Sequence, residues 1–152
     1  MTTTFIITAI IVILDQALKI WTQNHLTLNQ TLEIIPDFFQ LNYIHNTGAG
    51  WGLFAGQRFF LIGVTFLVIF YLVYLIWKNR YHSLWTKLAY ALLLGGAVGN
   101  LIDRLVRGYV VDMLQIRLFD FPIFNLADVA LTLGVILLII MVIWTEEGSD
   151  LI

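Results

Sequence analysis

Residues 95–128 read GGAVGNLIDRLVRGYVVDMLQIRLFDFPIFNLAD, and this stretch places two aspartates, Asp112 and Asp128, at the two ends of a link between apolar segments. Neither aspartate has a basic residue at helical spacing. Because the link is short, both carboxyl groups can lie at the same end of the flanking segments and approach each other. Two close carboxyl groups cannot both ionise cheaply, so such a pair shares a proton.

The whole chain has the composition of a polytopic membrane protein rather than of a soluble domain. Its 152 residues are 60% hydrophobic and 12% charged, and the mean hydropathy is +0.88. The length predicts a single membrane domain that covers 1–152. A net charge of −2 shows no basic surplus, so no nucleic-acid partner is expected.

Four segments are long and apolar enough to span about 30 Å of hydrocarbon. We expect an all-α polytopic fold, with transmembrane helices at about 4–23, 59–77, 84–106 and 124–145 and an outer platform at about 25–58. The first segment lacks a positive leading region and a small-residue cleavage site. It is therefore expected to be a retained helix and not a cleaved signal peptide.

Charge asymmetry predicts the orientation of these helices. Lys78, Arg80 and Lys87 flank the short connection between the second and third segments, and basic residues favour the cytoplasmic side. Both termini are then cytoplasmic, and the connections at 25–58 and 107–123 are external. The basic residues at 104, 107 and 117 lie toward the outer side. Arg104 and Arg107 are expected to pair locally with the neighbouring Asp103.

The first connection carries an expected strand and an expected short helix. Phe39, Leu41 and Tyr43 alternate with polar residues across 39–46, which favours a strand. The turn-rich residues that follow lead to Trp51 and Phe54, and these side chains could hold a short helix against the membrane surface.

The residue inventory narrows the possible chemistry. The chain has no cysteine, its serines lie at 83 and 149, and its three histidines are scattered. These features argue against thiol, buried serine and paired-histidine zinc chemistry. No metal site and no cofactor are expected, and any hydrolysis would depend on carboxyl groups.

Polar residues gather at one side of the predicted bundle. Asp15 and Lys19 are spaced to form a salt bridge along the first helix, and 100, 103, 104 and 107 form one stripe on the third. Asn125 could cap the fourth helix or orient Asp128. Gly95 and Gly99 are expected to allow close helix packing.

From spacing alone, three interpretations of Asp112 and Asp128 stay open. They could be helix caps, members of a proton or ion relay, or an acid and a base for hydrolysis. A membrane assembly subunit held by glycine packing is a further alternative, in which single aspartate changes would affect only complex formation.

Five blocks of sequence in this order resemble the lipoprotein signal peptidase (signal peptidase II) family. They are DQALK at 15–19, NTGA at 46–49, GNLIDR at 99–104, VVD at 110–112 and FNLAD at 124–128. The resemblance covers essentially the whole chain. Gly50 and Met113 depart from the family pattern, without touching the two aspartates.

The resemblance implies a function, a site and a location. The family removes the signal peptide from bacterial prolipoproteins on the amino side of a diacylglyceryl-modified cysteine. Asp112 and Asp128 match its catalytic pair. The implied fold adds an outer β-cradle and a small interfacial helix to the four-helix bundle. Positions implied to support the site or the substrate are Asp15, Lys19, Asn46, Gly48, Asn100, Asp103, Arg104 and Asn125. We accordingly expect a monomer in the bacterial inner membrane that contacts lipid, is blocked by globomycin-type peptides and has its site toward the outer face.

Overall fold

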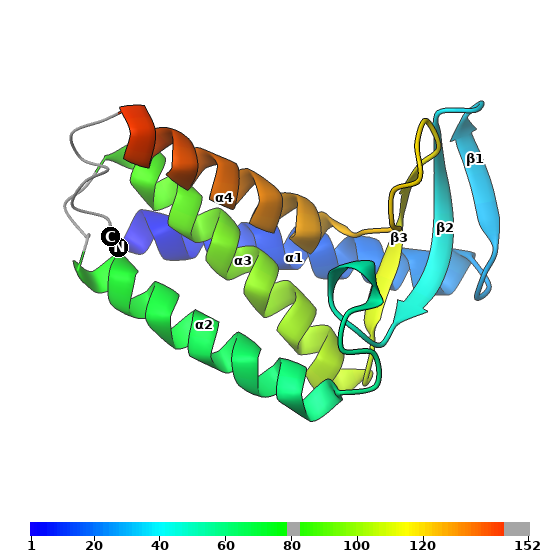
Figure 1. Ribbon diagram of the computed structural model, residues 1–152, viewed down its shortest axis with the longest axis horizontal. Coiled ribbons are helices and arrows are strands. Elements are labelled where there is room, and N and C mark those ends of the chain that lie inside the picture. Colours follow the sequence, from blue (N-terminus) through cyan, green and yellow to red (C-terminus); the bar gives the residue numbers. More distant parts are fainter. Residues whose placement is uncertain (79–82, 145–152) are drawn as a thin grey trace.

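Four long helices form a bundle, and a small sheet stands across one end of it (Figure 1). The computed structural model describes residues 1–78 and 83–144. Within these ranges, each of the four helices is long and apolar enough to cross a membrane, which confirms the expected fold class. The helices are α1 (Thr2–His25), α2 (Arg58–Lys78), α3 (Leu84–Val106) and α4 (Leu126–Trp144).

Helix α3 is the centre of the bundle. In the most apolar 18-residue stretch of α3, 67% of the residues are buried, against 22% in the corresponding stretch of each of the other three helices. Glycines of α3 that face α1 and α4 explain how these two neighbours come so close. A Cβ on Gly95 would lie 2.8 Å from the Ile11 side chain of α1. A Cβ on Gly96 would collide with the Ala127 carbonyl oxygen at the start of α4. The expected glycine-mediated packing is confirmed.

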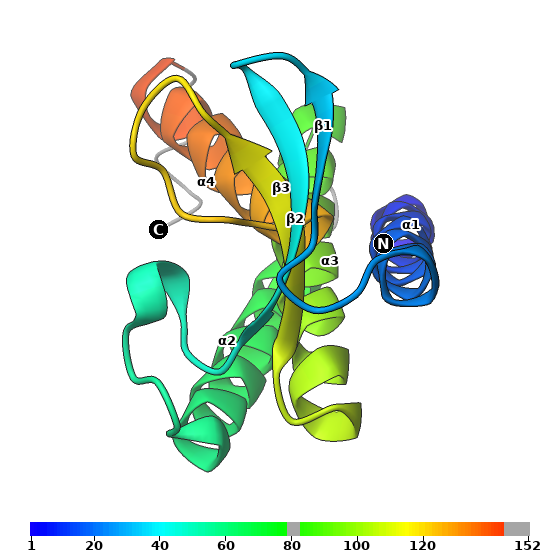
Figure 2. The ribbon, with the colours of Figure 1, turned by 90° about the vertical axis from the view of Figure 1, so that its right-hand side faces the viewer.

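The sheet has three antiparallel strands in the order β1-β2-β3. They are β1 (Thr31–Ile35), β2 (Phe39–Asn46) and β3 (Val110–Ile116). The strand expected across 39–46 is confirmed as β2. An apolar cluster holds the sheet to the bundle, with Val111 and Met113 fully buried. Figure 2 shows the sheet end, with α1 and the 47–57 loop on opposite sides of β2 and β3.

Register between β2 and β3 is broken in the middle, which isolates one end of the pair. Phe39 to Leu41 pair with Ile116 to Leu114, and pairing resumes only at Ile44, opposite Asp112. The last pair joins Asn46 to Val110. This short second segment brings the end of β2 beside Asp112.

The 47–57 loop contains only one short turn of helix. The interfacial helix expected near Trp51 is a 3-10 turn, η1 (Gly50–Gly52). Trp51 has φ of 55°, and its 75% exposed side chain meets the Phe121 ring edge-on at 6.1 Å between centroids.

The termini of the helices place all the expected polar residues at the sheet end of the bundle. Helices α1 and α3 end there and α4 begins there (Figure 1). The basic connection at 78–83, which sets the expected orientation, falls mostly outside the described residues, as does Thr145 at the end of the expected fourth helix.

Candidate active site

Asp112 and Asp128 line the same cleft, although one lies on a strand and the other on a helix. Asp112 is the third residue of β3 and is 1% exposed. Asp128 lies in the first turn of α4. The cleft has a volume of about 450 Å³ and is bordered by the end of β2, η1, α3 and the link before α4. The structure therefore brings together the two carboxyl groups that the sequence places at the ends of that link.

Asn125 connects the two carboxyl groups directly. Its Nδ2 donates to Asp112 Oδ1 at 2.6 Å. Its Oδ1 accepts the Asp128 backbone N–H at 2.9 Å, and its own N–H donates to Asp128 Oδ2 at 3.2 Å. This reciprocal arrangement is a capping box, with Asn125 before the helix and Asp128 three residues later. The sequence left capping and orientation as alternatives for Asn125, and the structure shows both.

Two further amides hold the other carboxyl oxygens. Asn46 Nδ2 donates to Asp112 Oδ2 at 2.9 Å, and Asn100 Nδ2 donates to Asp128 Oδ1 at 2.8 Å. Every oxygen of the pair thus receives an N–H donor, which fixes the plane of each carboxyl group.

The surroundings of Asp112 raise its pKa from 3.8 to about 7. Burial is the largest cause, because it penalises the charged form, and the charge of Asp128 acts in the same direction. The bonds from Asn46 and Asn125 oppose this rise because they favour the carboxylate. At neutral pH this carboxyl group can therefore both hold and release a proton.

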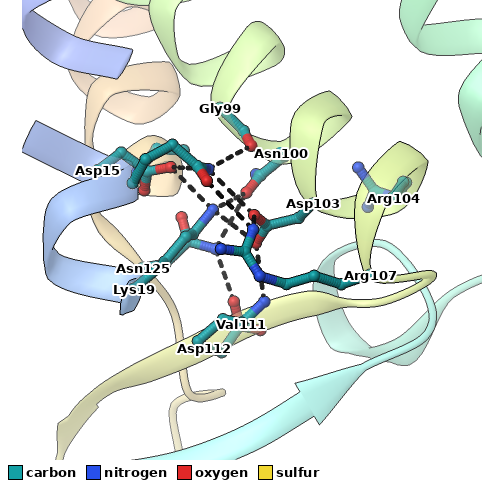
Figure 3. A network of polar contacts seen from close by, with 12 residues as sticks. Asp15, Lys19, Gly99, Asn100, Asp103, Arg104, Arg107, Val111, Asp112 and Asn125 are labelled. Atoms are coloured by element: carbon teal, nitrogen blue, oxygen red, sulfur yellow. Dashed lines mark hydrogen bonds and ion pairs between the residues drawn. The ribbon is translucent and has the colours of Figure 1, made fainter. Parts of the chain in front are cut away.

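Behind the pair, Lys19 lies at the centre of a fully buried ion cluster (Figure 3). Its ammonium group is 2.9 Å from Asp15 Oδ2 and 3.0 Å from Asp103 Oδ2, and it donates to Asn100 Oδ1 at 3.0 Å. Three acceptors thus satisfy the three N–H donors of the ammonium. The expected Asp15–Lys19 bridge is confirmed, but Lys19 also binds two residues of α3.

The two aspartates bound by Lys19 each hold the backbone next to a cleft aspartate. Asp103 Oδ2 accepts the N–H of Val111 at 3.0 Å, one residue before Asp112. Asp15 Oδ1 accepts the N–H of Ala127 at 2.9 Å, one residue before Asp128. Lys19 therefore links the anchors of both chain segments.

The charge on Lys19 also fixes which way the amides point. An ammonium only donates, so Asn100 must turn its oxygen toward Lys19 and its Nδ2 toward Asp128. The Asn100 oxygen then also accepts from Asn125 Nδ2 at 3.1 Å. That contact leaves the Asn125 oxygen for the N-terminus of α4.

The expected local pairing of Arg104 with Asp103 is wrong. Arg104 stands apart from the dashed network in Figure 3, and its Nη2 donates to the Gly48 carbonyl at 2.9 Å. The ion pair belongs to Arg107, whose Nη1 is 2.5 Å from Asp103 Oδ1. Although both arginines lie near Asp103 in sequence, Arg104 faces the cleft and holds the 47–57 loop.

Sequence reasoning missed two glutamines that complete the cluster. Gln16 Nε2 donates to Asp103 Oδ1 at 3.0 Å and to the Gly99 carbonyl at 3.1 Å. Gln23 Oε1 accepts from Arg107 Nε at 3.1 Å. Gln16 and Gln23 lie seven residues apart on α1, and that helical spacing was the one available signal.

The arrangement can perform acid–base chemistry with a single shared proton. One carboxylate can take a proton from water, and the other carboxyl group can give one to a substrate oxygen or nitrogen. Within 1–78 and 83–144, no group of three or more His, Asp or Glu side chains is placed to hold a metal ion.

Comparisons with known proteins agree in sequence and in fold. A family model described as "Signal peptidase (SPase) II" matches residues 7–144. The "Lipoprotein signal peptidase" of Enterococcus faecalis is 43% identical over 145 residues, which cover 95% of this chain and 90% of that one. The protein of the same name from Streptococcus thermophilus strain CNRZ 1066 is 43% identical over 137 residues, covering 90% and 89%.

Two solved structures share the fold. A "Bacterial membrane enzyme structure by the in meso method at 2.3 A resolution" aligns with a TM-score of 0.90 and 37% identity, covering 94% of this chain and 88% of that one. A second with the same wording at 1.9 Å has a TM-score of 0.87 and 37% identity, covering 95% and 94%.

Proposed function

Because the chain belongs to the signal peptidase II family, we propose that Asp112 and Asp128 are its catalytic pair. Membership makes the chain a membrane protease that processes prolipoproteins. One observation carries the assignment of the pair: two carboxyl groups line one cleft, and Asn125 donates to both, from its side chain to Asp112 and from its backbone N–H to Asp128.

In the proposed reaction the pair holds one proton. The ionised carboxylate removes a proton from a water molecule, whose oxygen attacks the scissile carbonyl carbon. The protonated carboxyl group gives its proton to the carbonyl oxygen. When the tetrahedral intermediate collapses, the proton taken from water passes to the leaving nitrogen, and the pair recovers its original proton from the intermediate's hydroxyl group. The amide donors keep each carboxyl group in place through these transfers.

The proposed cut lies on the amino side of a cysteine that carries a diacylglyceryl group. A second cleft of about 280 Å³ supports this substrate class. It shares Asn100, Arg104 and Asp128 with the first cleft and continues along apolar residues of α2 such as Leu61 and Val68. An apolar chain in that cleft would lie against the bundle while the scissile bond reaches the carboxyl groups.

The remaining assignments follow from the same interpretation. We propose that the protein is a monomer with one domain in the bacterial inner membrane and that both of its termini are cytoplasmic. Globomycin-type peptides are proposed to block it. The proposed supporting residues are Asp15, Lys19, Asn46, Gly48, Asn100, Asp103, Arg104 and Asn125.

A gel-shift cleavage assay with lipidated and unlipidated prolipoprotein tests the proposal. Asp112→Asn and Asp128→Asn should each lower cleavage of the lipidated substrate by roughly 10³-fold or more, because each removes one half of the acid–base pair. Asp120→Asn, in the exposed part of the link, is the matched control and should cleave normally. Substantial cleavage by either cleft variant, or equal cleavage of unlipidated substrate, would contradict the assignment.

A further inference from the structure

His45 lies beside the site, although neither the acid–base chemistry nor the buried ion cluster uses it. It occupies β2 directly before Asn46 and pairs with Val111. Its ring stacks on that of Tyr109, with centroids 3.6 Å apart and planes 18° apart. Its Nε2 is 2.8 Å from the Tyr43 hydroxyl oxygen. The imidazole thus touches both chain segments that meet at Asp112.

The stack joins β2 to the start of β3 at the end that carries the site. Tyr109 directly precedes Val110, the partner of Asn46. The irregularity between Leu41 and Ile44 leaves the strand pairing of 44–46 separate from that of the rest of β2. Beyond Asn46 the chain enters the 47–57 loop, where Trp51 adopts positive φ. The stack of His45 on Tyr109 adds a side-chain contact between the two strands at this end, beside the backbone pairing of 44–46 with 110–112.

The Tyr43 hydroxyl orients the ring of His45 for this stack. Tyr43 is buried, at 6% exposure, and its side chain also interacts with Gln23 and Tyr109. The surroundings partly desolvate His45 and lower its pKa, so the ring is neutral at pH 7 and one nitrogen can accept from the hydroxyl. Tyr43 belongs to the apolar cluster beneath the sheet. The hydrogen bond from its hydroxyl therefore ties the imidazole to a buried side chain.

We propose that His45 is a positioning residue: by stacking on Tyr109 it holds the end of β2 against β3, so that the Asn46 amide stays bonded to Asp112. The inference rests on the proposed function. His45 acts through Asn46 and takes no part in the proton transfers. Because it also lines the first cleft, its loss should lower kcat more than it changes KM.

Replacement of the side chain separates stacking from hydrogen bonding. His45→Ala should lower kcat roughly three- to tenfold, the size expected for loss of one aromatic pair. His45→Phe keeps a ring on Tyr109 and should restore most of the rate. His45→Gln keeps a polar atom without the ring and should not. Restoration by Gln alone, or a change in KM alone, would overturn the proposal.

A double-mutant cycle tests whether His45 acts through Asn46. In an Asn46→Ala background, His45→Ala should have no further effect on kcat. A full additional loss would mean that His45 acts elsewhere, and would overturn the proposal. His25→Ala is the matched control, because His25 also stacks on an aromatic ring, that of Trp21, at the end of α1. It should retain the wild-type kcat.

Hydrogen exchange in detergent tests, without substrate, whether the stack of His45 on Tyr109 holds the end of β2 against β3. His45→Ala should speed amide exchange in 44–46 and 110–112 and leave 39–41 unchanged. Unchanged exchange at 44–46 would overturn the positioning role of His45 even if the enzyme cleaves as proposed. Failure of the wild-type chain to cleave prolipoprotein would instead overturn the proposed function. The exchange result would still show whether His45 holds the two strand ends together.

Discussion

At Asp112, burial and hydrogen bonding act in opposite directions on one carboxyl group. Burial and the neighbouring Asp128 favour the protonated form, and the bonds from Asn46 and Asn125 favour the ionised form. The net result is a pKa of about 7. A carboxyl group poised near neutrality is what acid–base work by a proton-sharing pair requires.

This balance predicts the pH dependence of cleavage. Above pH 7 Asp112 loses the shared proton, so kcat/KM should fall as the pH rises through about 7. Asn46→Ala removes a donor that favours the ionised form, and should move this alkaline limb to higher pH. A pH–rate profile of both proteins measures the shift. A limb that stays in place or moves to lower pH would contradict this account of Asp112.

The buried ammonium of Lys19 predicts a large loss of stability. Lys19→Met leaves the Asp15 and Asp103 carboxylates without their shared cation and frees Asn100 to turn. Removing one partner from a buried ion pair typically costs about 3–5 kcal/mol. Thermal unfolding in detergent should show a markedly lower Tm.

Two variants serve as controls for Lys19→Met. Adding Asp15→Asn should recover part of the stability, since one unpaired charge is then removed. Lys78→Met, at the exposed end of α2, should leave the Tm unchanged. Equal stability of Lys19→Met and the wild type would show that the ammonium does not hold the cluster together.

At single residues, the sequence revealed local pairs but not distant ones. Helical spacing predicted the bridge between Asp15 and Lys19, because both lie on one helix. It could not show that Lys19 also meets Asp103, which depends on how α1 and α3 pack. Arg107 lies four residues after Asp103 and Arg104 directly follows it, so helical spacing alone favoured Arg107 as the partner. The bond from Arg104 to the Gly48 carbonyl depends on where the 47–57 loop lies and had no local signal.

At the scale of the elements, the glycines of α3 set the distance between helices. Gly96 faces the Ala127 carbonyl oxygen and Leu131 of α4. Gly96→Ala should push the start of α4, and Asp128 with it, away from α3. Overpacking of this kind typically costs about 1–3 kcal/mol, and both the Tm and kcat should fall.

Gly63→Ala is the matched control for Gly96→Ala, because it makes the same change in a spanning helix. A Cβ on Gly63 would meet nothing within 4 Å, and alanine is the better helix former. The Tm of this variant should be equal to or slightly above that of the wild type. If both alanine variants behaved alike, close packing at Gly96 would not be what limits the approach of α4.

Hydrophobic length and alternation were sufficient to predict the four helices and β2. The sequence could not predict which strands pair, because β2 and β3 are separated by two spanning helices. The broken register at Leu41–Ile44 has no local sequence signal either. Because of this break in register, Ile44 lies opposite Asp112, and Asn46 therefore reaches the Asp112 carboxyl group.

At the scale of the whole molecule, the buried charged residues and the buried asparagines gather toward the end of the bundle that carries the sheet. The proposed orientation puts this end at the outer face. Because the chain contains no cysteine, single cysteines can report it. Asp37→Cys, at the exposed tip between β1 and β2, should react with an impermeant maleimide in intact cells. Thr2→Cys should react only after permeabilisation. The reverse pattern would show that the orientation is inverted.

The ion cluster has a consequence for how the protein enters the membrane. Lys19 and Arg107 each have an aspartate four residues earlier on the same segment, Asp15 and Asp103 respectively. These two cations can therefore enter the membrane paired with an aspartate of their own segment, which lowers the high cost of a lone charge in hydrocarbon. The cross-helix bond from Lys19 to Asp103 then forms only as the two segments associate. Biogenesis can thus separate insertion from assembly, with the second step completing the site.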